Sequence, residues 1–151
     1  MLGHLRARMG YEVARQMFHR PWLMRQPRVW RWMEGQFARL ANLGDTRAQS
    51  FYGHILAFRG QGLSAREEGR RLLRLAALGG DGKAAYQVGV FSLAGSLGRA
   101  PDAVEAASWW ERAVKAGHPL ALLKLVALYE QGGPGLLPNP ERAQQYRAEP
   151  A

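Results

Sequence analysis

The chain contains no cysteine among its 151 residues. This absence excludes structural disulfides, metal sites built from thiolates and cysteine nucleophiles. It does not identify a redox compartment. A chain of this length with 47% apolar residues can bury about two thirds of the surface that its unfolded state exposes. A folded domain therefore needs neither a disulfide nor a metal ion for its stability.

Long apolar runs are also missing. No stretch approaches the roughly 18 consecutive apolar residues of a transmembrane helix. The first thirty residues are interrupted by charged side chains at Arg6, Arg8, Glu12, Arg15 and Arg20. These interruptions leave no apolar core for a secretory signal peptide. We therefore expect a cytoplasmic protein, with peripheral attachment to a membrane left open.

Residue patterns that support catalysis or cofactor binding are absent as well. The four histidines, His4, His19, His54 and His118, stand apart and lack the spacing of metal ligands. His118 is expected to cap a turn. Residues 79–82 resemble a phosphate-binding loop only weakly, because no strand pattern precedes them and no Gly-Lys-Ser/Thr follows. We expect no enzyme activity, no catalytic residue, no metal site and no cofactor.

Positive charge is abundant and unevenly spread. Lysine and arginine number 21 against 12 acidic residues, a surplus of nine. Residues 1–43 contain eight arginines and only two acidic residues, Glu12 and Glu34. Arginine suits contacts with phosphate or carboxylate groups, but the codon usage of a GC-rich genome produces the same excess. We favour the codon explanation, so charge alone is weak support for nucleic-acid binding.

A short pattern that begins with glycine and ends with alanine recurs along the chain. Its copies begin at Gly44, Gly80 and Gly117, at spacings of 36 and 37 residues. Apolar residues keep the same register around each copy, as expected for a repeat of two helices. The first helices are predicted at 45–58, 81–94 and 118–131, and the second helices at 29–43, 65–78, 102–116 and 140–148.

Small residues mark the predicted contacts between these helices, because two antiparallel helices approach to about 8 Å only where the crossing point is small. The predicted contact positions are Ala48, Gly53, Ala76, Ala84, Gly89 and Ala113. Asp45, Asp81 and Asp102 suit helix starts, and the glycine of each repeat suits a helix end. The predicted fold class is all-α: a short superhelix of antiparallel helix pairs, preceded by an N-terminal amphipathic helix.

Two stretches carry a family resemblance. Residues 105–121 combine an Ala-rich helix, two tryptophans and a terminal Ala-Gly turn, and residues 132–135 read Gly-Gly-Pro-Gly before a further helix. These segments resemble the Sel-one-like repeat (SLR) family, relatives of tetratricopeptide repeats. The resemblance covers about residues 29–148, or about three repeats. Two positions depart from the family pattern: Val126 replaces a glycine, and Gly69 replaces a helix alanine.

The resemblance implies an α-superhelix that binds a protein or peptide on its concave side and has no catalytic machinery. The related tetratricopeptide pattern places the concave surface on defined positions of each first helix. Carried over to this chain, the partner-binding residues are Arg47, Ser50, His54, Phe58, Lys83, Tyr86, Val90, Leu93, Leu123, Ala127, Glu130 and Gln131. An alternative of equal weight is that Tyr86 and Phe58 merely complete a core.

Residues 1–28 are predicted to form a basic amphipathic helix and a linker, outside the solenoid of residues 29–148. Leu2, Leu5, Met9, Val13 and Met17 share one stripe of this helix, which Pro21 should end. We favour a capping role, in which the segment covers the first exposed apolar face of the solenoid. Tryptophan and arginine interleave along residues 21–32, so an anionic membrane surface bound by residues 2–32 is an alternative.

The leading functional hypothesis is therefore a non-catalytic interaction module, such as an adaptor, a scaffold or a neutralising (immunity) partner. A peripheral membrane protein is the second hypothesis, and nucleic-acid binding is a minor third. The oligomeric state cannot be predicted from this sequence.

Overall fold

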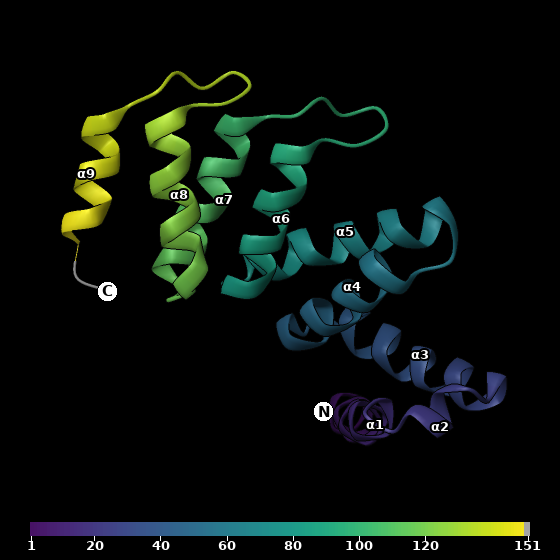
Figure 1. Ribbon diagram of the computed structural model, residues 1–151. Coiled ribbons are helices and arrows are strands. Elements are labelled where there is room, and N and C mark those ends of the chain that lie inside the picture. Colours follow the sequence, from purple (N-terminus) through teal and green to yellow (C-terminus); the bar gives the residue numbers. More distant parts are fainter. Residues whose placement is uncertain (150–151) are drawn as a thin grey trace. The chain divides into compact units, whose positions relative to one another are not determined.

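The computed structural model describes residues 1–149 (Figure 1). This part of the chain contains nine α-helices and no β-strand, with only two isolated β-bridges in loops. The helices are α1 (Leu2–Phe18), α2 (Pro21–Met24), α3 (Pro27–Asn42), α4 (Thr46–Arg59), α5 (Gly62–Leu78), α6 (Gly82–Ala94), α7 (Ala103–Lys115), α8 (Pro119–Gln131) and α9 (Pro140–Ala148). The all-α prediction is confirmed, and the predicted repeat helices agree with the structure to within three residues at each end.

The chain divides into two compact units, Met1–Leu72 and Leu73–Ala151. The division falls inside α5. Unit 1 contains α1 to α4 and most of α5, so residues 1–28 pack in the same unit as α3 and α4. Unit 2 contains the end of α5 and the helices α6 to α9. Figure 1 shows α6 to α9 side by side in sequence order, with the α6–α7 and α8–α9 loops at the same end of the unit.

Aspartate caps begin the repeat helices, as predicted. Asp45, Asp81 and Asp102 each accept a hydrogen bond from the backbone N–H three residues later, at 2.9, 2.7 and 2.9 Å. Each bond satisfies a donor that the first turn of a helix leaves unpaired. The helix before two of these caps ends in a glycine with a positive φ, 88° at Gly44 and 96° at Gly80. A left-handed residue there costs glycine little.

Small residues allow the close helix contacts that the repeat pattern predicts. In unit 2, a Cβ on Gly89 would lie 2.3 Å from Nε1 of Trp110, so only glycine leaves room for this buried ring. In unit 1, a Cβ on Gly69 would lie 2.3 Å from the backbone nitrogen of Ala57 and 2.8 Å from the carbonyl oxygen of Gly53. Gly69, a departure from the family pattern, therefore has a steric reason, since α5 and α4 meet backbone to backbone.

A cluster of aromatic rings lies in the core of unit 1. Phe37 and Phe51 make an edge-to-face contact with ring centroids 5.3 Å apart, and Tyr11 and Phe18 pack against both. This geometry aligns the positive ring edge with the negative ring face of a neighbour. Because Tyr11 and Phe18 belong to α1, the N-terminal helix is part of the core rather than an appendage.

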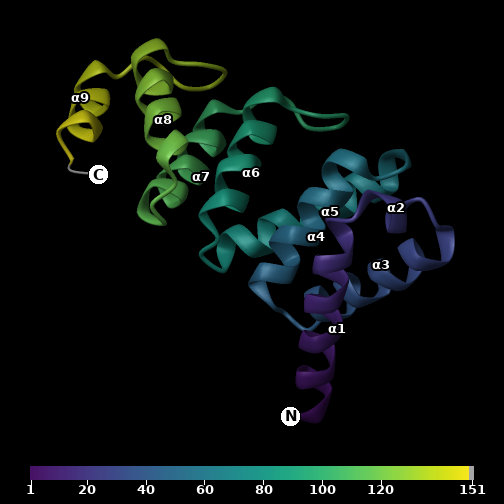
Figure 2. The same ribbon diagram turned by 60° about the horizontal axis from the view of Figure 1, so that its bottom comes forward.

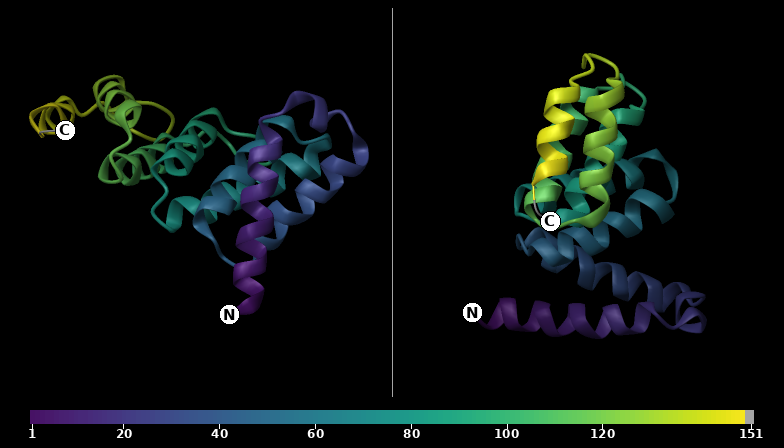
Figure 3. Two further views of the ribbon diagram at one scale, coloured as in Figure 1. Left: turned by 90° about the horizontal axis from the view of Figure 1, so that it is seen from below. Right: turned by 60° about the vertical axis from the view of Figure 1, so that its left-hand side comes forward.

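The face by which α1 packs differs from the predicted stripe. Ala7, Tyr11 and Ala14 are buried, whereas Leu2, Leu5, Met9 and Val13 are exposed; of the predicted stripe, only Met17 packs against the core. The apolar stripe that the helical projection marks is therefore mostly exposed, and it is not the face by which α1 packs. The two alanines let α1 approach α3 closely, and the aromatic rings between them fill the space. Figures 2 and 3 show the first half of α1 extending beyond α3.

Candidate partner-binding surface

The predicted binding residues of unit 2 differ in exposure: Lys83, Leu123, Glu130 and Gln131 are exposed, whereas Tyr86, Val90 and Leu93 are half-buried and pack against the core. We call this set the first-helix face of unit 2: Lys83, Tyr86, Val90 and Leu93 on α6, and Leu123, Ala127, Glu130 and Gln131 on α8. Spacings of three and four residues bring each group to one side of its helix. The opposite sides carry the buried residues, which include Val88 on α6 and Leu125 on α8.

An aromatic stack occupies the start of this face. The Tyr86 ring lies parallel to the imidazole of His118, with centroids 4.5 Å apart and an interplanar angle of 10°. Behind it, Nε1 of Trp110 donates a hydrogen bond to the backbone oxygen of Tyr86 at 3.0 Å. The stack links α6 to the beginning of α8 and fixes the orientation of the half-buried tyrosine.

His118 holds the N-cap position of α8, but its side chain makes no capping hydrogen bond. The expectation that the His118 side chain caps a turn is therefore wrong. The imidazole stacks on Tyr86 instead. Burial lowers the pKa of His118; the charge of Lys83 lowers it as well, and the charge of Asp81 acts in the opposite direction. The lowered pKa favours the neutral imidazole at pH 7.

The chemistry of the face changes along its length. Lys83 is an exposed cation, Val90 and Leu93 are half-buried, and the Leu123 side chain is 68% exposed. At the far end of α8, the Glu130 carboxylate pairs with Arg147 of α9. The face thus carries a cation, one exposed leucine and a partly compensated carboxylate.

Unit 1 carries a smaller counterpart on α4. Arg47 and Phe58 are exposed, and the His54 ring lies nearly parallel to that of Phe58 with centroids 6.5 Å apart. Nδ1 of His54 donates to the backbone oxygen of Ser50 at 2.7 Å. Ser50 itself is buried, so of this group only Arg47, His54 and Phe58 present accessible side chains.

A cleft in unit 1 lies beside Arg47. It has a volume of about 580 Å³ and opens between α1 and the α3–α4 turn. Its residues are Arg8, Met9, Tyr11, Glu12, Val13, Leu40, Asp45 and Arg47. The Glu12 carboxylate lies 3.9 Å from the guanidinium of Arg47 and 3.8 Å from that of Arg15.

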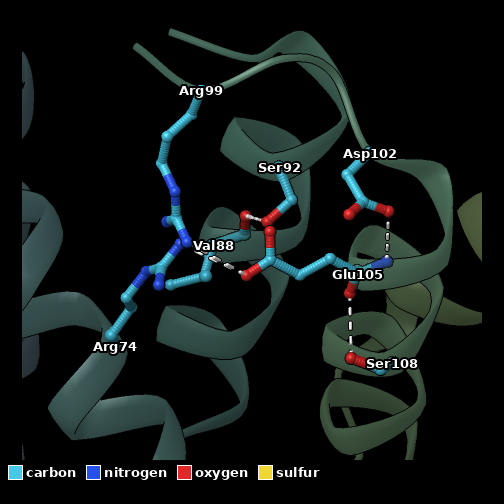
Figure 4. A network of polar contacts seen from close by, with 7 residues as sticks. All are labelled: Arg74, Val88, Ser92, Arg99, Asp102, Glu105 and Ser108. Atoms are coloured by element: carbon cyan, nitrogen blue, oxygen red, sulfur yellow. Dashed lines mark hydrogen bonds and ion pairs between the residues drawn. The ribbon is translucent and has the colours of Figure 1, made fainter. Parts of the chain in front are cut away.

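A polar network supports α6 and α7 in unit 2 (Figure 4). The Glu105 carboxylate accepts a hydrogen bond from Arg74 at 3.3 Å and lies 3.9 Å from the guanidinium of Arg99 in the α6–α7 loop. Ser92 donates to the backbone oxygen of Val88 at 2.9 Å within α6. The Glu105 contacts tie the loop and the end of α5 to α7, the second helix of the repeat.

A second cluster, which the sequence analysis missed, fastens α9. The Tyr129 hydroxyl donates to Glu111 at 2.7 Å, Arg142 donates to the same carboxylate oxygen at 3.3 Å, and the Tyr129 and Tyr146 rings stack 5.9 Å apart. Burial works to raise the pKa of Glu111, but the interactions with both tyrosines and Arg142 outweigh it and lower the pKa. The residues come from α7, α8 and α9, so no pattern within one helix could reveal the cluster.

Among residues 1–149, no group of three or more His, Asp or Glu side chains is arranged to hold a metal ion. In the same range, no helix is both long and apolar enough to cross a bilayer.

The family is decided by the repeat itself. A family model for the Sel1 repeat matches residues 46–81, 82–118 and 120–146. The chain belongs to the Sel1 repeat family. Each matched segment begins within a residue of a first helix and continues through or into the second helix that follows. Sel1 repeat proteins are generally modules for protein–protein interaction and typically non-catalytic scaffolds.

Solved structures with the same architecture come from bacteria. The chain is 29% identical to a Sel1 repeat protein from Oxalobacter formigenes, with a TM-score of 0.64 over 76% of this chain and 45% of that one. It is 23% identical to c5321, a protective antigen of uropathogenic Escherichia coli strains with an SLR fold, with a TM-score of 0.64 over 76% of this chain and 24% of the other. The second likeness shows the fold alone.

This Sel1 repeat chain thus spans less than half the length of either protein. No curated protein matches it.

Proposed function

We propose that this Sel1 repeat protein is a non-catalytic adaptor, scaffold or neutralising partner that binds a protein or peptide on the first-helix face of unit 2. The observation that carries the proposal is the exposed apolar side chain of Leu123 on that face. Leu123 projects into solvent from α8 although the opposite side of the same helix is buried. Exposed apolar side chains grouped beside charged groups are characteristic of interaction surfaces.

The rigidity of the surroundings supports a binding role. The Tyr86–His118 stack and the Trp110 hydrogen bond hold the aromatic part of the face in one conformation. A surface ordered before binding loses less conformational entropy when a partner docks. The exposed Phe58 of α4 provides a second contact point, in unit 1.

Quantitative co-purification from native cells tests the proposal. Leu123→Glu places a charge in the centre of the face without disturbing the core, because the side chain is exposed. We expect the amount of each specific partner to fall by about tenfold or more, as for the loss of a central apolar contact. Phe58→Glu tests the α4 contribution in the same way.

Val104→Glu is the matched control. Val104 lies on the second helix α7 and its side chain is 51% exposed, so the substitution introduces the same charge on another surface. The control should retain every partner. Two results would rule out this face as the binding site: the partners still co-purify with the Leu123→Glu variant, or they are lost to the same extent from the Val104→Glu variant.

A further inference from the structure

Nearly all of the surplus positive charge lies in unit 1. Residues 1–72 contain thirteen arginines and five acidic residues, a surplus of eight of the nine charges in the chain. Most of these arginines are exposed, including Arg6 and Arg8 on α1. The Sel1 matches begin at residue 46, so the repeat pattern does not account for the charge on α1 to α3.

Helix α1 has two apolar faces on opposite sides. The inner face packs against α3 through Ala7, Tyr11 and Ala14. The residues of the outer face are Leu2, Leu5, Met9 and Val13, which are 84, 56, 69 and 53% exposed. Their spacing of three or four residues keeps them in one line along the helix. Four large apolar side chains exposed in a row are costly in water and call for a partner surface.

The outer face lies at the edge of unit 1, and its residues Met9 and Val13 also line the cleft beside Arg47. Figure 1 shows α1 at the edge of the unit, next to α3. On a helical projection, Arg6 follows one edge of the apolar line, and Arg8 lies beyond the other edge. Apolar side chains bordered by arginine are the arrangement of helices that lie in the interface of an anionic bilayer.

We propose that the outer face of α1 is a site of peripheral contact with an anionic lipid surface. Leu2, Leu5, Met9 and Val13 enter the boundary between headgroups and acyl chains. Arg6 and Arg8 pair with lipid phosphates, for which guanidinium geometry is well suited. The proposal does not depend on the first-helix face of unit 2.

Charge and shape favour lipid over two other partners. A second copy of the chain would bring an equally cationic surface, and a contact along one helix about 25 Å long falls short of the roughly 1,000 Å² that a stable interface needs. Nucleic acid would satisfy the arginines, but its phosphate surface offers nothing to four aliphatic side chains.

Sedimentation with vesicles tests the proposal on the full chain. The vesicles contain either phosphatidylcholine alone or phosphatidylcholine with one third phosphatidylglycerol. We expect binding only to the anionic vesicles, weakening as salt rises. The double variant Leu5→Glu/Met9→Glu should bind about tenfold or more weakly.

Leu97→Glu/Leu137→Glu is the control. These loop leucines of unit 2 are 87 and 85% exposed, so the control changes the net charge by the same amount. It should bind within about twofold of the wild type. Failure of the wild type to bind anionic vesicles, or equal weakening in both double variants, would overturn the proposal. Two other results would also overturn it. One is a duplex oligonucleotide that the protein binds as tightly as the vesicles, with an affinity that Leu5→Glu/Met9→Glu does not change. The other is a dimer of the wild type that Leu5→Glu/Met9→Glu abolishes.

The absence of cysteine permits a direct second readout. Met9→Cys creates a unique attachment point for a polarity-sensitive fluorophore, and Leu137→Cys provides the same label in unit 2. Anionic vesicles should shift the emission of the label at position 9 to shorter wavelength and leave the label at position 137 unchanged. No shift at position 9, or an equal shift at both positions, would contradict the assignment to α1.

Discussion

Two helical glycines of unit 1 show how a single Cβ decides helix contact. A Cβ on Gly69 would lie within 2.3 Å of the α4 backbone, whereas a Cβ on Gly35 of α3 would meet nothing within 4 Å. The same substitution should therefore have opposite effects at the two positions.

We expect Gly69→Ala to lower the free energy of unfolding by about 1–3 kcal/mol, because α4 and α5 must separate. Gly35→Ala should raise it by about 0.5–1 kcal/mol, since alanine loses less backbone entropy than glycine in a helix. Urea denaturation measures both changes. A Gly69→Ala variant as stable as Gly35→Ala would show that α4 and α5 do not meet at this point.

The stacked His118 gives unit 2 a pH dependence. Burial lowers the pKa of His118 below its usual value of 6.5, so the unfolded chain binds the proton more readily than the folded one. The neutral imidazole contributes to the free energy of unfolding. This contribution is fully present above pH 6.5 and is lost as the pH falls through the lowered pKa of His118.

NMR titration of the His118 ring protons should give a pKa below 6.5, and His118→Gln should reduce the loss of stability on the acid side. The His118→Gln spectrum also assigns the resonance among the four histidines. A His118 pKa at or above 6.5 would contradict the buried stack on Tyr86.

At the scale of elements, α9 depends on the tyrosine cluster. It is nine residues long and has one buried residue, Ala143. Helices this short are marginal in isolation, so the stack of Tyr146 on Tyr129 and the contacts of Arg142 must hold α9 in place.

Tyr146→Ala should speed amide hydrogen exchange throughout α9 by about tenfold or more while leaving α6 unchanged, because local opening follows the lost contacts. Tyr146→Phe keeps the ring stack and loses only the hydroxyl, so its exchange should stay near that of the wild type. Equal exchange in α9 of all three proteins would mean that the cluster does not fasten the helix.

The sequence was most informative where the structure depends on local chemistry. Aspartate caps and glycines with positive φ are encoded by single residues, and they located the repeat helices to within three residues. The packing face of α1 does not follow from the apolar stripe, because a helical projection ranks side chains by hydrophobicity. The real contact uses the small Ala7 and Ala14, whose value depends on the aromatic rings of α3 and α4.

The candidate site was predictable only in part for the same reason. Repeat register placed Lys83, Tyr86 and Leu123 on one side of their helices, because that property is periodic. It could not show that Ser50 is buried or that His118 stacks on Tyr86, since both depend on contacts between residues distant in sequence.

For the molecule as a whole, the two units carry different surfaces. Unit 1 holds eight of the nine surplus positive charges and the exposed outer face of α1, whereas unit 2 is nearly neutral and carries the larger first-helix face. This division matches the two proposals, an anionic lipid surface at unit 1 and a protein or peptide at unit 2.

Site-specific photo-crosslinking tests the central claim most directly. A benzophenone amino acid replaces Leu123 on the first-helix face of unit 2 or, as the control, Val104 on α7, and the cells are irradiated. We expect a discrete cross-linked partner from position 123 and none from position 104. A partner captured from position 104 but not from position 123 would contradict binding on the first-helix face.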